Sequence, residues 1–152
     1  MSPSRRLQIP DAARYFVAGV LLWIVVDFGT AGGFRPSYLV RYGPALLVFY
    51  LGYPLFFTAL AFGRGWSERR LLAATLVAIV IVEVAFTGNP LVTTFPAMLF
   101  AIPLAVAVYL PLTFFPLWWV RGEMGWHRRL VVFLTAVEVA VMLLTVLGGV
   151  HQ

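Results

Sequence analysis

The chain is predicted to be an all-helical integral membrane protein, a bundle of five transmembrane helices, because of its apolar runs and the placement of its arginines. Of its 152 residues, 62% are hydrophobic and only 11% are charged. A water-soluble domain of this size cannot hide so much apolar surface. Five apolar runs are each long enough to cross a lipid bilayer, whose ~30 Å hydrocarbon core requires ~20 residues. They cover roughly residues 15–34, 44–62, 71–86, 96–120 and 130–147.

The arginines predict the orientation, since basic residues in short loops are retained on the cytoplasmic side. Only Arg35 and Arg41 fall on the other side. We therefore expect a protein of the cell membrane with its amino terminus in the cytoplasm and its carboxyl terminus outside. The net charge of +5 is then a topology signal that attracts anionic lipid, and nucleic-acid binding is not expected. The arginines of the predicted inner side are Arg5, Arg6, Arg14, Arg64, Arg69, Arg70, Arg121, Arg128 and Arg129.

The first span follows a polar segment, residues 1–12, that we expect to be a short cytoplasmic tail. Residues 13–152 then form a single transmembrane domain. Asp27 interrupts the first span, which makes an uncleaved membrane helix the preferred interpretation over a secretory signal.

The second and fourth spans are marked by prolines. Pro44 and Pro96 begin them and suit the first turn of a helix. Internal prolines remove backbone hydrogen bonds and bend a helix, freeing carbonyls that can bind water or a cation. A bent helix that only packs against its neighbours is the alternative. In the second span three residues recur at intervals of four and are expected to face the interior: Tyr50, Pro54 and Thr58.

The third and fifth spans each follow a Gly-Trp loop with two arginines and each contain the triplet Glu-Val-Ala. Laying the second and third spans over the fourth and fifth gives possible repeat units 41–90 and 93–150. The fold would then be one helix plus two related helical hairpins. Because membrane sequences share a narrow composition, chance similarity is the alternative.

Missing residue types exclude many kinds of chemistry. The chain has no cysteine and no lysine, and its two histidines, His127 and His151, lie outside the spans. Thiolate metal sites, Schiff bases and haem ligation between helices therefore lack their ligands. We expect no cofactor and no metal, and an enzyme is the least favoured class because no nucleophile accompanies the acids.

Three acids within the spans, Asp27, Glu83 and Glu138, are the candidate ligand- or ion-binding residues. A charged acid at mid-bilayer costs ~2.5–3.5 kcal/mol, so such residues usually face a partner or a wet cavity. Binding of a proton or cation is one interpretation. The other is that the acids pair with Arg35 and Arg41 and only hold the bundle together.

Two function classes follow from these acids. The first is a small proton- or cation-coupled transporter or permease. The alternative is a non-catalytic subunit or assembly factor of a larger membrane complex. Five helices enclose a narrow interior, so we expect a homo-oligomer or a partner membrane subunit. Pairs of small residues offer close-approach surfaces for it, at Ala74 and Ala78 and at Ala136 and Ala140.

Overall fold

The structure is a computed structural model. It describes residues 9–31, 40, 43, 47–86, 93–122, 129–137 and 140, but not the side chains of residues 27–31 or 86. All regular structure in these residues is helical, and no strand occurs among them. The prediction of an all-helical chain is confirmed for this part of the sequence.

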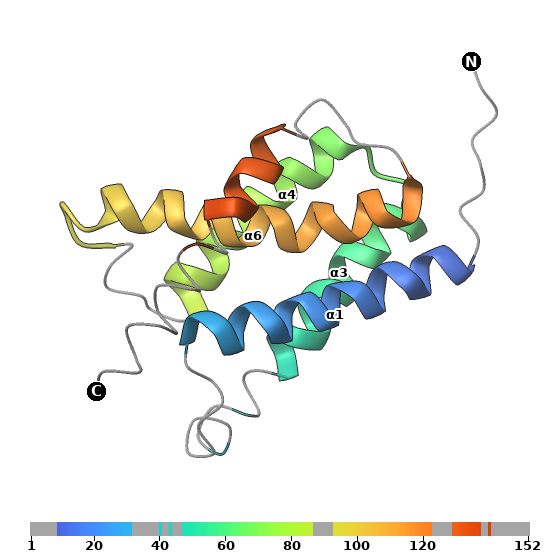
Figure 1. The fold of residues 1–152 in the computed structure, drawn as a ribbon, viewed down its shortest axis with the longest axis horizontal. Coiled ribbons are helices and arrows are strands. Elements are labelled where there is room, and N and C mark those ends of the chain that lie inside the picture. The colour runs from blue at the N-terminus through green and yellow to red at the C-terminus, as the bar shows by residue number, and fades with distance from the viewer. Residues whose placement is uncertain are drawn as a thin grey trace.

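Five helical segments run through the described residues (Figure 1). The first is α1 (Ile9–Ala31). The second is a continuous run of η1 (Val48–Gly52), α3 (Tyr53–Thr58) and η2 (Ala59–Gly63). The third is α4 (Glu68–Val80), which continues as η3 (Ile81–Phe86). The fourth is α6 (Met98–Arg121), and residues 129–137 form the fifth.

The helix ends follow local chemistry. The first helix begins at Ile9, so residues 9–12, which were expected in the tail, are helical. Pro10 is tolerated there because the first turn has no intrahelical use for its missing N–H. The fourth helix ends at Gly122, whose φ of 67° lies in the left-handed region, and the Gly122 N–H donates to the Trp118 carbonyl at 2.8 Å. Glycine adopts this conformation without the penalty of a Cβ.

The second helix changes its winding around Pro54. A proline lacks the N–H of its turn, and its ring clashes with the carbonyl four residues earlier. The preceding turn, η1, is a wider π-helix, which leaves room for the ring. A second π-helical turn, η2, closes this helix, and there the Arg64 N–H donates to the Ala59 carbonyl at 2.9 Å. Such turns are rare and often mark functional sites.

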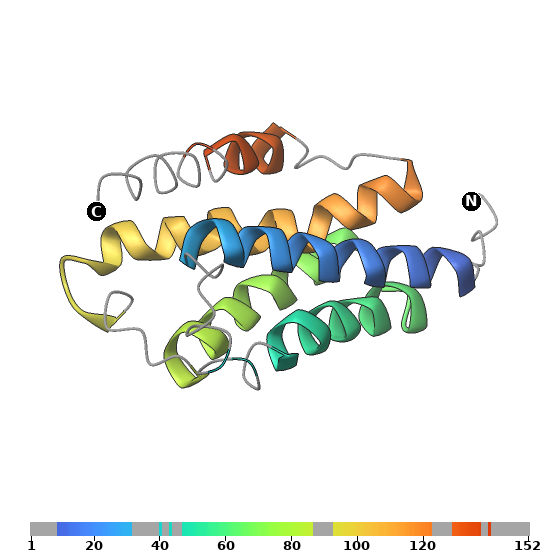
Figure 2. The same ribbon diagram turned by 60° about the horizontal axis from the view of Figure 1, so that its bottom comes forward.

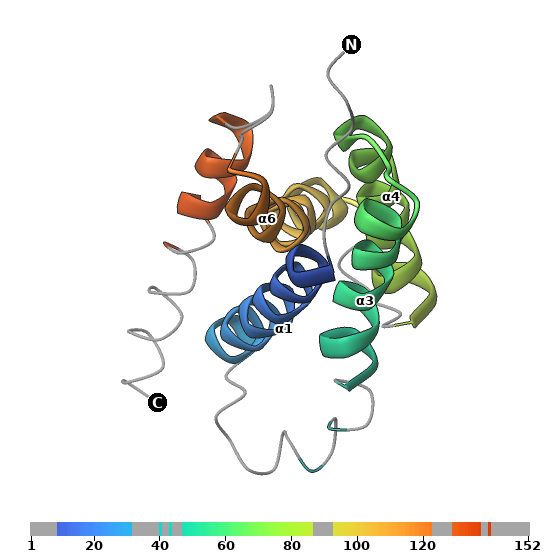
Figure 3. The same cartoon turned by 90° about the vertical axis from the view of Figure 1, so that its right-hand side faces the viewer.

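The segments form three layers, with α6 in the middle. The central helix contacts α1 on one side and α4 on another, and α1 also contacts α3 and η1. Figures 2 and 3 show α1 and α6 between the α3–α4 pair and residues 129–137. The last segment joins the core through Val131, which is fully buried.

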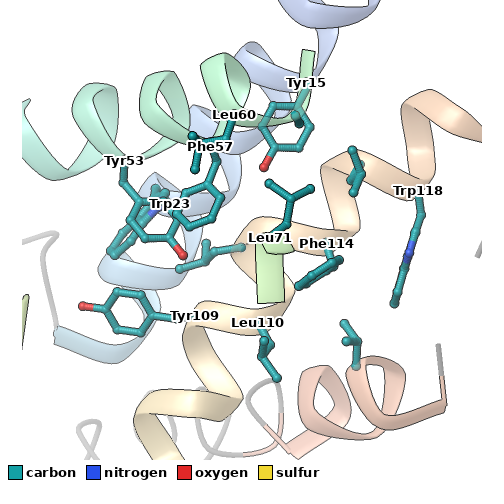
Figure 4. Close-up of a cluster of buried hydrophobic side chains, with 14 of the residues drawn as sticks. Tyr15, Trp23, Tyr53, Phe57, Leu60, Leu71, Tyr109, Leu110, Phe114 and Trp118 are labelled. Carbon is teal, nitrogen blue, oxygen red and sulfur yellow. The ribbon is translucent and has the colours of Figure 1, made fainter. Parts of the chain in front are cut away.

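The core is rich in aromatic side chains (Figure 4). The Trp23 ring packs edge-on against Tyr53, with centroids 5.2 Å apart, and against Tyr109 at 5.5 Å. Close packing of the first two helices depends on Gly19. A Cβ at this glycine would lie 3.1 Å from the Cβ of Pro54, tighter than an ordinary contact.

Several arginine-bearing helix ends meet at one end of the bundle, which we call the basic end. The ring of Phe62 lies 5.4 Å from that of Tyr15, and the guanidinium carbon of Arg121 lies 5.9 Å from the centre of the Phe62 ring. The start of α1, the end of η2 and the end of α6 are therefore together (Figure 1). This is the arrangement that alternating helix directions predict.

Two helices are long and apolar enough to cross a membrane by length and composition. They are Ile9–Val26, within α1, and Met98–Arg121. The run Val48–Gly63 is apolar but shorter. Five spanning helices are thus not established by these criteria, and that finer statement stays a prediction.

Candidate functional site

Four buried hydroxyl side chains from four helices meet in the bundle interior, and we call them the hydroxyl network: Tyr15, Tyr53, Thr75 and Thr113. Thr113 is its centre. The Thr113 hydroxyl lies 2.7 Å from the Tyr53 hydroxyl and 3.2 Å from that of Thr75. The Tyr15 hydroxyl donates to the Thr113 backbone carbonyl at 3.0 Å. One residue of α6 therefore joins three other helices.

The donors and acceptors of this network can be assigned consistently. Thr113 donates to the Tyr109 carbonyl at 3.2 Å, which leaves its oxygen free to accept from Tyr53 and from Thr75. Thr75 has one proton and two acceptors, the Leu71 carbonyl at 2.9 Å and the Thr113 hydroxyl. It must share that proton or alternate between them. Each of these buried hydroxyls thus has a partner, as burial requires.

Thr113 belongs to a proline-rich part of α6. It lies between Pro111 and Pro116 in α6, and both prolines are buried within the helix. Pro116 lacks the N–H that would bind the Leu112 carbonyl and distorts the turn before it. The Tyr15 hydroxyl adds a hydrogen bond to a carbonyl of this same turn.

A second polar contact, the hydrogen bond between Tyr109 and Glu83, lies next to this network, and we call these two residues the acid pair. The Tyr109 hydroxyl donates to Oε1 of Glu83 at 2.9 Å. Glu83 is partly buried and lies in the π-helical segment η3. The rings of Tyr109 and Tyr53 are 5.7 Å apart, which places the acid pair beside the aromatic part of the core. An acid in this position can bind a proton or a small cation while tyrosine orients one of its oxygens.

Trp23 adds a donor to the same region. Its indole Nε1 is buried and has no hydrogen-bond partner among the described residues. Buried polar groups are nearly always paired, so such a donor marks a polar position in the interior. Asp27 follows Trp23 by one helical turn in α1, but its side chain lies outside the described residues.

The structure places one of the three predicted acids. Glu83 is partly buried and engaged by Tyr109. Asp27 is in α1 without a described side chain, and Glu138, Arg35 and Arg41 lie outside the described residues. A shared site of three acids and its pairing with arginines therefore stay predictions.

The polar residues of the second and third segments differ in their burial. Thr75, eight residues before Glu83, is fully buried in the network. Tyr50 and Pro54 are buried as expected. Thr58 is partly buried, and its hydroxyl donates to the Pro54 carbonyl of its own helix at 2.6 Å. It offers nothing to the interior.

Sequence reasoning missed Thr113 and the three tyrosines Tyr15, Tyr53 and Tyr109. Their signal was weak, because a tyrosine in an apolar run is as consistent with an interface position as with a buried one. The spacing of Tyr109 and Thr113, one turn apart in a proline-rich helix, was the available indication.

Within the part of the chain that the structure describes, no three or more histidine, aspartate or glutamate side chains gather in a way that could hold a metal ion. No protein-family model, no curated protein and no solved structure matches this chain. Inferences about function therefore depend on the residues themselves.

Proposed function

We propose that the protein is an integral membrane protein, and helix burial supports this. Most residues in the core helix of a soluble protein are buried. In the two long apolar helices, only 22% and 39% of the residues in the apolar window are buried inside the fold. Their outer faces consist of large apolar side chains. Water would disfavour so extended an apolar surface, whereas lipid covers it. Large apolar side chains are also exposed on α3 and α4. Examples from the four helices α1, α3, α4 and α6 are Val17, Leu21, Val25, Leu55, Phe56, Val77, Val80, Leu99 and Phe100.

The distribution of polar groups supports the same proposal. The hydroxyl network lies inside the bundle, and Thr75 and Thr113 are fully buried. In the middle of a bilayer a hydroxyl is better placed against another helix than against lipid tails. The basic end would face the cytoplasm of a cell membrane, with the carboxyl terminus outside after five spans.

Within that membrane we propose a proton- or cation-coupled transporter in which Glu83 binds the coupling ion. The observation that carries this proposal is the hydrogen bond from Tyr109 to Glu83 inside the bundle. A partly buried carboxylate in a membrane helix costs free energy. Such residues are therefore rare and commonly mark ion or proton pathways. Asp27 and Glu138 are the further acids that we propose for the same pathway.

A non-catalytic subunit or assembly factor is the second candidate. The hydrogen bond between Tyr109 and Glu83 also supports this function, if its role is structural. Because Tyr109 already satisfies one oxygen of Glu83, the acid could serve only to fix α6 against η3. In that case a partner chain or a second copy would cover the apolar outer faces.

Reconstituted vesicles separate the two candidates. Glu83→Gln keeps the shape and the acceptor for Tyr109 but removes the titratable charge. A transporter should stay folded and lose flux driven by a pH or cation gradient, and Tyr109→Phe should weaken that flux. Glu68→Gln, an acid in the first turn of α4, is the matched control and should keep wild-type flux.

Wild-type flux in Glu83→Gln would refute the transport proposal. Absence of flux in the wild-type protein, together with a partner that co-purifies with wild-type but not with Glu83→Gln protein, would establish the second candidate instead.

A further inference from the structure

A surface groove of about 460 Å³ lies between the second and third helical segments, on α3, α4 and η3. Its volume is in the ~300–1,000 Å³ range of ligand sites. Apart from one arginine, every lining side chain is aliphatic or aromatic. The lining residues are Phe56, Trp66, Arg70, Ala73, Ala74, Val77, Ala78 and Ile81.

Most of this lining is one face of a helix. Counted from Arg70, the lining positions of α4 and η3 follow at three, four, seven, eight and eleven residues, which is the spacing of a single helical face. The three alanines of this face are short and line the groove on the side of α4, and Phe56 lines it from α3. Glu68 is two residues before Arg70 and so lies off this face.

The groove has the length of one lipid leaflet. From Arg70 to Ile81 the helix rises ~16 Å at ~1.5 Å per residue. Half of a ~30 Å hydrocarbon core is ~15 Å. The groove therefore extends from the basic end to about the middle of the bilayer that we propose around this protein.

The surroundings of the groove favour its occupant. The groove is open toward the outside of the bundle, and its lining is apolar along α4 and η3. In the membrane that we propose around this protein, the molecules that reach such a face are lipids, whose acyl chains are apolar and long enough to follow it.

The positive charge of Arg70 at one end of the groove favours a lipid with an anionic headgroup. Arg70 is exposed and forms no ion pair with any other described residue. It stands at the cytoplasmic end of the groove beside Trp66, where an amphipathic ring favours the membrane interface. A guanidinium can bind phosphate oxygens in pairs.

We propose that this groove binds one anionic phospholipid of the cytoplasmic leaflet, with an acyl chain along Ala74 and Ala78 and the headgroup phosphate on Arg70. This inference depends on the proposed membrane location but not on transport.

Native mass spectrometry of the detergent-solubilised full chain tests the proposal, using phosphatidylglycerol and phosphatidylcholine with identical acyl chains. The wild-type protein should bind phosphatidylglycerol more tightly. Arg70→Gln should weaken that binding about fivefold, the equivalent of ~1 kcal/mol per basic residue near anionic lipid, and should abolish the preference. Arg69→Gln, its exposed neighbour off the groove face, should keep the preference.

Filling the groove tests the acyl-chain half of the proposal. Ala78→Leu should weaken binding of both lipids, whereas Ala13→Leu, the same substitution at an exposed position of α1 outside the lining, should weaken neither. Unchanged lipid binding in Ala78→Leu would overturn the proposal, and so would a dimer that this substitution dissociates without affecting lipid. Equal binding of the two lipids to wild-type protein would overturn the headgroup assignment.

The outcomes are distinct from those of the proposed function. Glu83→Gln should bind phosphatidylglycerol like the wild-type protein even when flux is lost. Release of the chain from membranes by salt or alkali without detergent would instead refute the membrane location itself.

Discussion

The hydroxyl network and the acid pair are adjacent in the bundle but differ in how completely they are enclosed. Thr75 and Thr113 have no exposed surface, and every hydroxyl of the network is bonded to a neighbouring helix or to its own. Glu83 is only partly buried and belongs to a π-helical segment. The first region joins four helices, and the second joins two.

This difference separates a structural role from an exchangeable one. A fully buried and satisfied network rigidifies a core, and removing one member leaves its partners unpaired. Glu83 is partly exposed and accepts a hydrogen bond from Tyr109, so a small ion can reach it without opening the bundle. Substitutions in the two regions should therefore affect different measurements.

The largest loss of stability should come from Thr113→Val. Valine has nearly the same shape but no hydroxyl, so Tyr53 and Thr75 each lose a hydrogen-bond partner in a buried site. Leaving such a group unsatisfied costs ~1–3 kcal/mol. We expect a clearly lower midpoint of thermal unfolding in detergent, measured by circular dichroism.

Thr58→Val is the matched control for this substitution. Among the described residues, the Thr58 hydroxyl bonds only to the Pro54 carbonyl of its own helix, so its loss should change the midpoint little. Equal effects of the two substitutions would contradict a network role for Thr113.

A smaller loss is expected for Tyr15→Phe. It removes one hydrogen bond to the Thr113 carbonyl but keeps the ring that packs 5.4 Å from Phe62. The free energy of unfolding should fall by ~0.5–1.5 kcal/mol. Combined with Thr113→Val in a double-mutant cycle, a coupling near zero would show that the backbone and hydroxyl contacts of Thr113 are independent.

The smallest effect on stability should come from Glu83→Gln, because the amide oxygen can still accept from Tyr109. We expect a thermal midpoint within a few degrees of the wild type, together with the loss of flux described above. A midpoint as low as that of Thr113→Val would place Glu83 with the structural network and would favour the assembly role.

Sequence alone predicted the helices well where long apolar runs define them. The helical residues of α6, Met98–Arg121, match the predicted fourth span closely. The first helix begins before its predicted span, since Pro10 and the charged pair Asp11 and Arg14 are compatible with a first turn. The π-helical turns around Pro54 could not be predicted, because they depend on how the proline ring is accommodated.

The candidate site was harder to predict than the fold. Glu83 was found because an acid in an apolar run is conspicuous by its cost. Thr113 and the tyrosines were missed because a hydroxyl is tolerated on any helix face. Only the contacts between helices show which hydroxyl side chains belong to the network. The close approach at Gly19 could not be predicted either, because the sequence does not show which neighbour a single glycine in an apolar helix will contact.

The central position of α6 has a consequence for biogenesis. If the protein has the membrane location proposed above, α1, α3 and α4 emerge from the ribosome and reach the membrane before residue 98 does. Until then, Tyr53 lacks the Thr113 hydroxyl, and α1 and α4 lack the helix that both of them contact. The early helices should therefore insert as a loose group that becomes compact only when α6 arrives. Translation of the fourth segment would be the step that commits the nascent protein to its final structure.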